Sequence, residues 1–218
     1  MSEVRWNYSS EVLAVNDIKQ GGSIHVDMKG SKSRSTIFVA LLRGVNVGGN
    51  NMISMRALKE SFETIGFTNV STYINSGNII FQSKEDDPRK LERKIEQMLS
   101  SDYQLNSKVV LRSLSEMEKL VKALPKDWGG DSGWRYNVIF LRHSIDSEKI
   151  LDELPTNSDI EEVLYRPGTL LWSVQASEAT RSKFVKLASR KSFQEMTVRN
   201  LNTTRKLHDL MKKAAETD

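Results

Sequence analysis

The apolar residues of this chain fall into short runs that predict alternating strands and helices from residue 36 onwards. Residues 37–42 are apolar at successive positions, which is typical of a strand covered on both faces. Ser54 suits a helix N-cap, and apolar residues at helical spacing follow it until Gly66 ends the pattern. This part of the chain is therefore predicted to begin with a buried strand and an amphipathic helix.

Two further strands, a second helix and a fourth strand complete the first predicted unit. Residues 70–75 and 78–82 have the pattern of strands joined tightly at Ser76–Gly77. Asp87–Pro88 suits the start of a helix, and residues 107–112 form the fourth strand. The order β-α-β-β-α-β is the split arrangement called ferredoxin-like.

The second half of the chain repeats this order after a connecting helix, at whose start Ser115 and Glu118 have capping-box spacing. The further predicted elements are a strand over 136–142, a helix over 147–154, strands over 160–165 and 169–174, a helix over 178–189, a strand over 194–199 and a last helix after Asn202. The two hairpins also match in residue type, since residues 167–172 correspond to 76–81 at a constant shift, 167 − 76 = 91. Such matching indicates an internal duplication.

The predicted fold class is α+β, with two tandem ferredoxin-like subdomains at residues 36–114 and 135–218, the second of which includes a C-terminal helix. Residues 115–134 form the connecting helix and its loop. Residues 1–35 show little apolar periodicity, and we expect them to be a flexible N-terminal extension. Because the first strand of each half is apolar on both faces, the halves should pack together, or a partner chain, as in a homodimer, should cover them.

Composition excludes several classes of protein. The 218 residues are 38% hydrophobic, which suffices for a core, but the chain lacks a run of about 18 apolar residues that could span a membrane. The absence of cysteine excludes disulfides, thiolate metal sites and a cysteine nucleophile. The histidines, His25, His143 and His208, are far apart in sequence, so we expect no metal site. A cytoplasmic location without membrane contact is the default expectation.

The net charge of +4 is unevenly distributed along the chain. From residue 181 to the end, ten Lys and Arg stand against four Asp and Glu, and 10 − 4 = +6. This basic segment is either a solvated helix face or a surface that faces an anion. RNA is one such anion, because ferredoxin-like sheets can bind it.

The loop over residues 43–51, rich in Gly and Asn, is the first candidate for ligand binding. It has the glycine spacing of a P-loop, but Asn50 and Asn51 replace the lysine and hydroxyl residue that phosphate and Mg²⁺ require. The dinucleotide pattern also fails, because Asn46 stands where the second glycine belongs. With no nucleophile and base beside these loops in sequence, ordinary hydrolase chemistry is not indicated, no cofactor is expected, and whether the protein is an enzyme stays open.

A second polar stretch, residues 196–206, precedes the last predicted helix. Arg205 and Lys206 fall in the first turn of that helix, where the helix dipole disfavours cations by roughly 0.3 to 1 kcal/mol each. A bound anion would offset this cost, although the side chains could also bend away into water.

Three motifs resemble a known family. Residues 43–49 together with Met55, residues 72–78 and residues 197–203 are similar, in order, to the bacterial family called domain of unknown function 1697. The resemblance implies a tandem ferredoxin-like fold and no established activity. The sequence departs from the family pattern at Asn50, Met52 and Leu201, so its ligand could differ from those of relatives.

We therefore expect a small anionic ligand to bind, and possibly to react, where these three stretches converge. Two alternatives stay open: an RNA-binding or other nucleic-acid-binding module, and a scaffold or interaction protein without a ligand. The expected Arg199→Ala effect on stability is below about 1 kcal/mol, as for a surface site. The predicted ligand-binding residues are Arg43, Asn46, Gly48, Gly49, Tyr73, Ser76, Asn78, Arg199, Asn200, Asn202 and Thr203.

Overall fold

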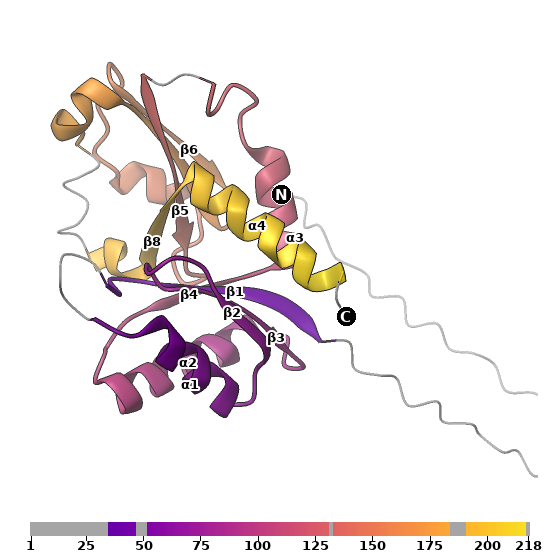
Figure 1. Cartoon of the computed structure of the whole chain (residues 1–218). Helices are drawn as coiled ribbons and strands as arrows, with labels where there is room; N and C mark the ends of the chain where they lie inside the picture. Colours follow the sequence, from indigo (N-terminus) through magenta and orange to yellow (C-terminus); the bar gives the residue numbers. More distant parts are fainter. Residues whose placement is uncertain (1–34, 47–51, 131–132, 184–190, 217–218) are drawn as a thin grey trace, which may run out of the picture. The chain divides into compact units, whose positions relative to one another are not determined.

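In the part of the chain that the structure describes, two four-stranded antiparallel sheets form the framework of the fold (Figure 1). The structure is a computed structural model that describes residues 35–46, 52–130, 133–183 and 191–216. These residues belong to one compact unit, residues 33–218. The expected N-terminal extension therefore lies almost wholly outside the described residues.

The first half contains one sheet in the strand order β2-β3-β1-β4. Its elements are β1 (Thr36–Leu42), α1 (Met55–Thr64), β2 (Thr68–Thr72), β3 (Asn78–Ser83), α2 (Pro88–Tyr103), β4 (Val109–Ser113) and α3 (Leu114–Ala123). The second half contains the other sheet in the equivalent order β6-β7-β5-β8. Its elements are β5 (Trp134–Leu141), η1 (Glu148–Glu153), β6 (Glu161–Arg166), β7 (Thr169–Gln175), η2 (Ala176–Arg181), η4 (Lys191–Glu195), β8 (Met196–Asn200) and α4 (Leu201–Glu216).

These two sheets confirm the predicted α+β fold of two tandem ferredoxin-like subdomains. The duplication also includes the last helix of each half, because α3 follows β4 directly and α4 follows β8 directly. The two helices lie side by side (Figure 1). The predicted connecting helix and the predicted C-terminal helix are thus equivalent elements of one repeat.

Local capping explains where the helices of the first half begin. The Ser54 side chain accepts a hydrogen bond from the Ala57 N–H at the start of α1, and Asp87 caps α2 directly before Pro88. Helix α3 starts earlier than predicted, because the capping box is formed by Ser113 and Glu116. The predicted pair, Ser115 and Glu118, has the same spacing as this observed pair, so spacing alone could not distinguish the two pairs.

The helices predicted at 147–154 and 178–189 differ from expectation. The described parts form short 3₁₀ helices, η1 and η2, and residues 184–190 lie outside the described residues. A proline at position 155 leaves too few residues for η1 to become a stable α-helix. In the described part of the second half, the segments that correspond to α1 and α2 therefore contain short 3₁₀ helices.

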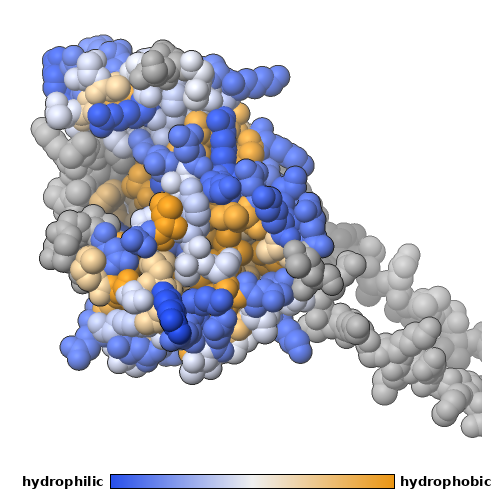
Figure 2. Space-filling view, viewed as in Figure 1, coloured by the Kyte–Doolittle hydropathy of each residue, from blue (hydrophilic) through white to orange (hydrophobic). Residues whose placement is uncertain are grey.

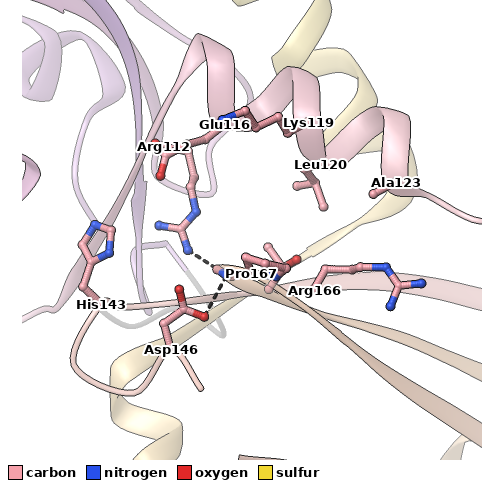
Figure 3. A pocket seen from close by; sticks show the side chains of 11 residues that line it. Arg112, Glu116, Lys119, Leu120, Ala123, His143, Asp146, Arg166 and Pro167 are labelled. Carbon is pink, nitrogen blue, oxygen red and sulfur yellow. Dashed lines mark hydrogen bonds between the residues drawn. The ribbon is translucent and has the colours of Figure 1, made fainter. Parts of the chain in front are cut away.

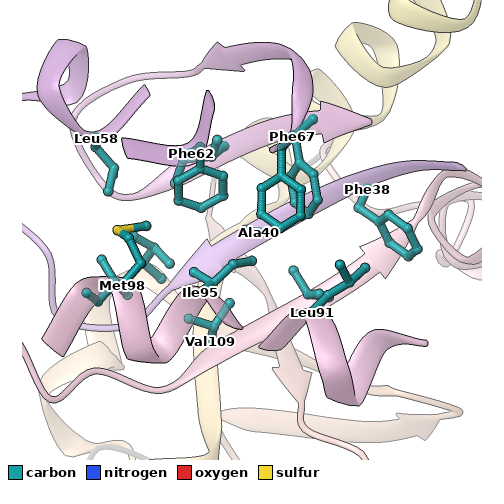
Figure 4. Packing of buried hydrophobic residues seen from close by; sticks show 14 of the residues in the cluster. Phe38, Ala40, Leu58, Phe62, Phe67, Leu91, Ile95, Met98 and Val109 are labelled. Atoms are coloured by element: carbon teal, nitrogen blue, oxygen red, sulfur yellow. The ribbon is translucent and has the colours of Figure 1, made fainter. Parts of the chain in front are cut away.

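The core divides into layers on either side of the two sheets. Between the first sheet and α1 and α2, four aromatic rings pack in a chain of contacts with centroids 4.3 to 5.8 Å apart (Figure 4). They are Phe38, Phe62, Phe67 and Phe81. A second cluster joins residues of both sheets with residues of α3 and α4, and a third covers the far face of the second sheet. Each half thus covers the inner face of the other, which explains why β1 and β5 are apolar on both faces.

Hydrophilic side chains occupy much of the molecular face shown in Figure 2, with apolar residues between them. Among the described residues, the large hydrophobic side chains that are exposed are Met52 and Ile74. Most large apolar side chains in the described part of the chain are therefore in the core layers, as expected for a folded domain in water.

Two equivalent arginines cross between the halves, and we call this pair of contacts the arginine clasp. Arg112 on β4 donates to the carbonyl oxygens of Leu141, at the end of β5, and Gly168, in the β6–β7 turn. Arg199 on β8 donates to the same two positions of the other half, as the next paragraph describes. Strand register confirms the equivalence, because Arg112 pairs with the middle of β1 as Arg199 pairs with the middle of β5.

The Arg199 side chain is buried at 8% exposure, and all of its N–H groups are used. Its Nη2 lies 2.9 Å from the Leu42 oxygen and 3.3 Å from the Gly77 oxygen, the counterparts of Leu141 and Gly168. The remaining acceptors are Asn78 Oδ1, Thr197 Oγ1 and the carbonyl oxygens of Ser76 and Val198. Burial lowers the Arg199 pKa to about 10, which still leaves the guanidinium charged at neutral pH.

Arg199→Ala should therefore lower the free energy of unfolding by about 3 kcal/mol, because it leaves several buried carbonyl groups without a donor. Urea unfolding of the full chain, followed by tryptophan fluorescence, would measure the loss. Arg181→Ala is the control, since the Arg181 side chain is 71% exposed and, among the described residues, pairs with Glu178 within η2, and it should cost about 0.5 kcal/mol or less. A loss below about 1 kcal/mol for Arg199→Ala would instead support the surface role expected from the sequence.

Candidate functional site

A pocket opens between α3 and the β6–β7 turn, at the boundary between the two subdomains (Figure 3). We call it the α3 pocket. Its volume is about 300 Å³, near the lower end of the range for small-molecule sites. Its lining residues are Arg112, Glu116, Lys119, Leu120, Ala123, His143, Asp146, Arg166, Pro167, Gly168 and Thr169.

Several elements bring these residues together. Helix α3 contributes Glu116, Lys119, Leu120 and Ala123, which are three or four positions apart and so share one face of the helix. The loop after β5 brings the histidine and the aspartate, and the β6–β7 turn forms the opposite wall. Arg112 reaches the pocket from β4, so residues distant in sequence depend on the packing of the two halves to meet.

Both carboxylates of the α3 pocket are already occupied by protein donors. Glu116 Oε2 accepts from the Ser113 N–H at 2.7 Å as part of the helix cap. Asp146 Oδ1 accepts from the Gly168 N–H at 2.8 Å and from the Tyr165 hydroxyl at 2.9 Å. Burial, with the hydrogen bond to Asp146, raises the pKa of Tyr165 to about 12, so this hydroxyl keeps its proton and continues to donate.

The basic groups of the same pocket are less fully used. Within the described ranges, the side chains of Lys119 and His143 make no hydrogen bond or ion pair, and the Arg166 side chain donates to the Tyr165 carbonyl. The buried Arg112 guanidinium carries a further positive charge and donates to carbonyl oxygens rather than to a carboxylate. The pocket therefore presents positive charge that its own carboxylates do not pair directly, which favours an anion.

The α3 pocket lies on the Arg112 side of the clasp, and the two repeats differ there at one position. In the first half, Asn78 lies beside Arg199, accepts from its Nε, and donates to the Tyr73 carbonyl and to Ser76. The equivalent residue in the second half is Thr169, which is shorter. Its Oγ1 is buried and has no hydrogen-bond partner among the described residues. The threonine cannot fill the space beside Arg112 as asparagine does beside Arg199.

A cluster of ionised groups lies next to the pocket. Arg142, directly after β5, contacts Glu92 at 3.2 Å and Glu96 at 3.1 Å on α2, and Glu195 at 3.2 Å on η4. Glu92 is almost fully buried, and burial raises the pKa of its carboxyl above the usual value, although Arg142 acts in the opposite direction. These ion pairs tie α2 of the first half to the second half.

The sequence predicted that Arg199, Ser76 and Asn78 share one site, and the structure does bring them into contact. Their arrangement corrects the expected role of Arg199 as the fork that holds an anion. All of its donors bind protein acceptors, so it is a buried link between the halves and not an open cation. Neighbouring residues could not reveal this, because four of its six acceptors, at the end of β1 and in the β2–β3 hairpin, are 121 to 157 residues away.

Other predicted residues of the Gly/Asn loop brace the chain. Asn46 exchanges two hydrogen bonds with the backbone of Ile53, at 2.7 and 2.9 Å, and so closes the loop across its ends. The Arg43 guanidinium lies 5.0 Å from the ring centroid of Phe193 on η4. Gly48 and Gly49 lie outside the described residues.

The remaining predicted residues lie near the hairpin and near the start of α4. Tyr73 is half-buried against the cluster between the sheets. Asn200 caps α4 by accepting from the Thr203 N–H at 2.7 Å. Asn200 and Asn202 also line a separate open pocket of about 620 Å³, which includes Trp134 and Trp172. The predicted residues therefore do not all face one pocket.

Sequence reasoning missed Arg112, Lys119, His143, Asp146 and Arg166. The hairpin at 76–78 aligns with 167–169 at the constant shift of 91 noted above, but that shift pairs Arg199 with Lys108. Arg199 corresponds to Arg112 at a different shift, 199 − 112 = 87, which the strand register shows and the hairpin alignment does not. The sequence repeat alone could therefore not transfer the expected site from one arginine to the other.

Two further observations concern membrane insertion and metal binding in the described part of the chain. Among the helices in the described ranges, none combines the length and the apolar character needed to cross a membrane. The described residues likewise contain no group of three or more His, Asp or Glu side chains placed to hold a metal ion.

Comparison with known proteins agrees with the architecture. The model of the family described as "Protein of unknown function (DUF1697)" matches residues 36–172. The chain is similar to the structure of conserved bacterial protein SP0830 from Streptococcus pneumoniae, with 25% sequence identity and a TM-score of 0.72. That similarity covers 82% of this chain and 99% of the other. No curated protein matches significantly.

Gly168→Ala should destabilise the fold more than Gly66→Ala. Both glycines have positive φ, +79° and +91°, so each alanine costs about 1 to 2 kcal/mol of backbone strain. A Cβ at Gly168 would also lie 2.9 Å from Arg112 Nη2, whereas one at Gly66 meets open space. The collision should add about 1 to 3 kcal/mol in urea unfolding. Equal losses for the two variants would mean that Arg112 moves aside freely.

Glu92→Gln tests the buried carboxylate. Since burial raises its pKa in the folded state, the native protein binds this proton more tightly than the unfolded chain. The contribution to stability is full below the ordinary pKa of 4.5 and is lost as pH rises through the raised value. The free energy of unfolding of the parent minus that of the variant should therefore fall from pH 4.5 to pH 7. A difference that stays constant or grows with pH would contradict this assignment.

Proposed function

We propose that this chain, which belongs to the family of proteins of unknown function DUF1697, binds a small anionic molecule in the α3 pocket. The observation that carries the proposal is the imbalance of partners in that pocket. The carboxylates of Glu116 and Asp146 accept from protein donors, whereas the side chains of Lys119 and His143 make no hydrogen bond or ion pair within the described ranges. A small anion would supply the missing partner.

The walls of the pocket support a ligand that also has an apolar portion. Leu120, Ala123 and Pro167 line it beside the charged groups. A site of about 300 Å³ with apolar walls and a few convergent charges fits a compact organic carboxylate or phosphate better than a bare ion or a polymer. The anion site expected at Arg199 is therefore proposed at the equivalent side of the clasp, around Arg112.

The two alternative functions have weaker support. Sheet-face RNA binding needs an open platform, but the inner faces of both sheets contribute to one buried cluster. A scaffold without a ligand would not account for the cationic pocket. The binding experiments that follow distinguish a scaffold from a ligand-binding protein.

Binding of benzoate, a compact aromatic carboxylate, would test the proposal by isothermal titration calorimetry on the full chain. We expect measurable binding that Lys119→Ala weakens by about tenfold, a loss of about 1.4 kcal/mol. Arg166→Ala should weaken it as well. The melting temperature should rise with benzoate in the parent and less in these variants.

Lys122→Ala is the matched control, because Lys122 is an exposed lysine on the same helix that does not line the α3 pocket. It should leave benzoate binding unchanged. If the Lys119 and Lys122 variants bind benzoate equally, the anion lies elsewhere. If benzoate, butyrate and phosphate all fail to bind at about 10 mM, far above the micromolar to millimolar range of metabolite sites, the scaffold alternative is favoured.

A further inference from the structure

A second pocket adjoins the α3 pocket, and the two share His143. We call it the α2 pocket. Its volume is about 350 Å³, and its lining residues are Arg89, Glu92, Arg93, Arg142, His143 and Ser144. The arginines at 89 and 93 come from the first turns of α2, and the last three residues come from the loop after β5. This pocket therefore also lies across the boundary between the subdomains.

The rim of the α2 pocket carries two arginines that the rest of the described chain does not neutralise. Arg89 and Arg93 are exposed and lie four residues apart, so their charges repel each other on one face of α2. Neither side chain has a hydrogen bond or an ion pair within the described residues. Such a pair is unfavourable in the early turns of a helix unless an anion offsets it.

The floor of the pocket differs from its rim. Arg142 is paired with three glutamates, so its charge is not available to a ligand. Glu92 Oε1 and Arg142 Nε are nevertheless buried without a hydrogen-bond partner in the described part of the chain. A bound oxygen would accept from the Arg142 Nε–H and reduce the free-energy cost of burying that donor, whereas Glu92 Oε1 is itself an acceptor and would need a donor. The floor and the rim thus both carry N–H donors that have no partner among the described residues.

We propose that the α2 pocket binds the phosphoryl group of a small phosphorylated molecule whose carboxylate and apolar body occupy the α3 pocket. This inference rests on the proposed function of the α3 pocket. Two guanidinium groups and an imidazole match a dianionic group with several oxygens better than a single carboxylate. The Ser144 hydroxyl lines the same pocket and donates to Glu195 Oε2. His143 lines both pockets, so a single molecule that fills both would lie against this side chain.

Three probes separate the two pockets in titrations of the full chain: inorganic phosphate for the α2 pocket, benzoate for the α3 pocket, and 4-carboxyphenyl phosphate for both. The double variant Arg89→Ala/Arg93→Ala should weaken phosphate binding by about tenfold or more and leave benzoate binding unchanged. Lys119→Ala should show the reverse. 4-Carboxyphenyl phosphate should bind at least about tenfold more tightly than either fragment, because the second contact becomes intramolecular, and both variants should weaken it.

The double variant Arg56→Ala/Lys59→Ala is the control, since it removes two positive charges from α1, away from both pockets. It should bind phosphate like the parent. Equal phosphate binding by the parent and the Arg89/Arg93 variant would overturn the inference, while the benzoate result decides the proposed function independently. A ten-nucleotide single-stranded RNA that binds more tightly than 4-carboxyphenyl phosphate, with steep salt dependence, would overturn it in favour of nucleic acid.

Discussion

The arginine clasp joins the halves through hydrogen bonds to carbonyl, amide and hydroxyl oxygens rather than through ion pairs. Two buried guanidinium groups lose most of their hydration, and this loss is tolerable only when their N–H groups meet acceptors in the correct geometry. Most of those acceptors are backbone atoms at strand ends and hairpin turns, whose positions depend on both sheets being complete. The clasp therefore selects one relative orientation of the two halves, and the pockets at their boundary depend on that orientation.

The two sides of the clasp show how a small sequence difference changes what an interface can do. Asn78 fills the space beside Arg199, while the shorter Thr169 stands beside Arg112 at the edge of the α3 pocket. The first side is consequently a closed structural contact. The second combines the same contact with a lined pocket and extra basic groups. The two copies of the repeat thus differ in whether a pocket adjoins the contact.

The fold could be predicted because its signals are local. The apolar run of β1, the cap at Ser54, the Asp87–Pro88 helix start and the Ser76–Gly77 turn each specify an element from a few neighbouring residues. The candidate site could not be predicted, because the chemical role of its side chains depends on which of them are buried. Arg199 has the sequence context of an anion ligand, yet contacts more than a hundred residues away consume its donors. Arg112 has the context of an ordinary strand residue.

The arginine clasp forms within one polypeptide, so its formation does not depend on the protein concentration. A contact in which position i meets position j, and the equivalent of j meets the equivalent of i, is the isologous contact of a two-fold dimer. Here both partners belong to one polypeptide, joined by α3 and the segment up to β5. Such an interface forms at the effective concentration set by its linker, commonly millimolar for a short one, and dilution cannot dissociate it. The boundary pockets thus exist in every folded molecule, however little of the protein a cell contains.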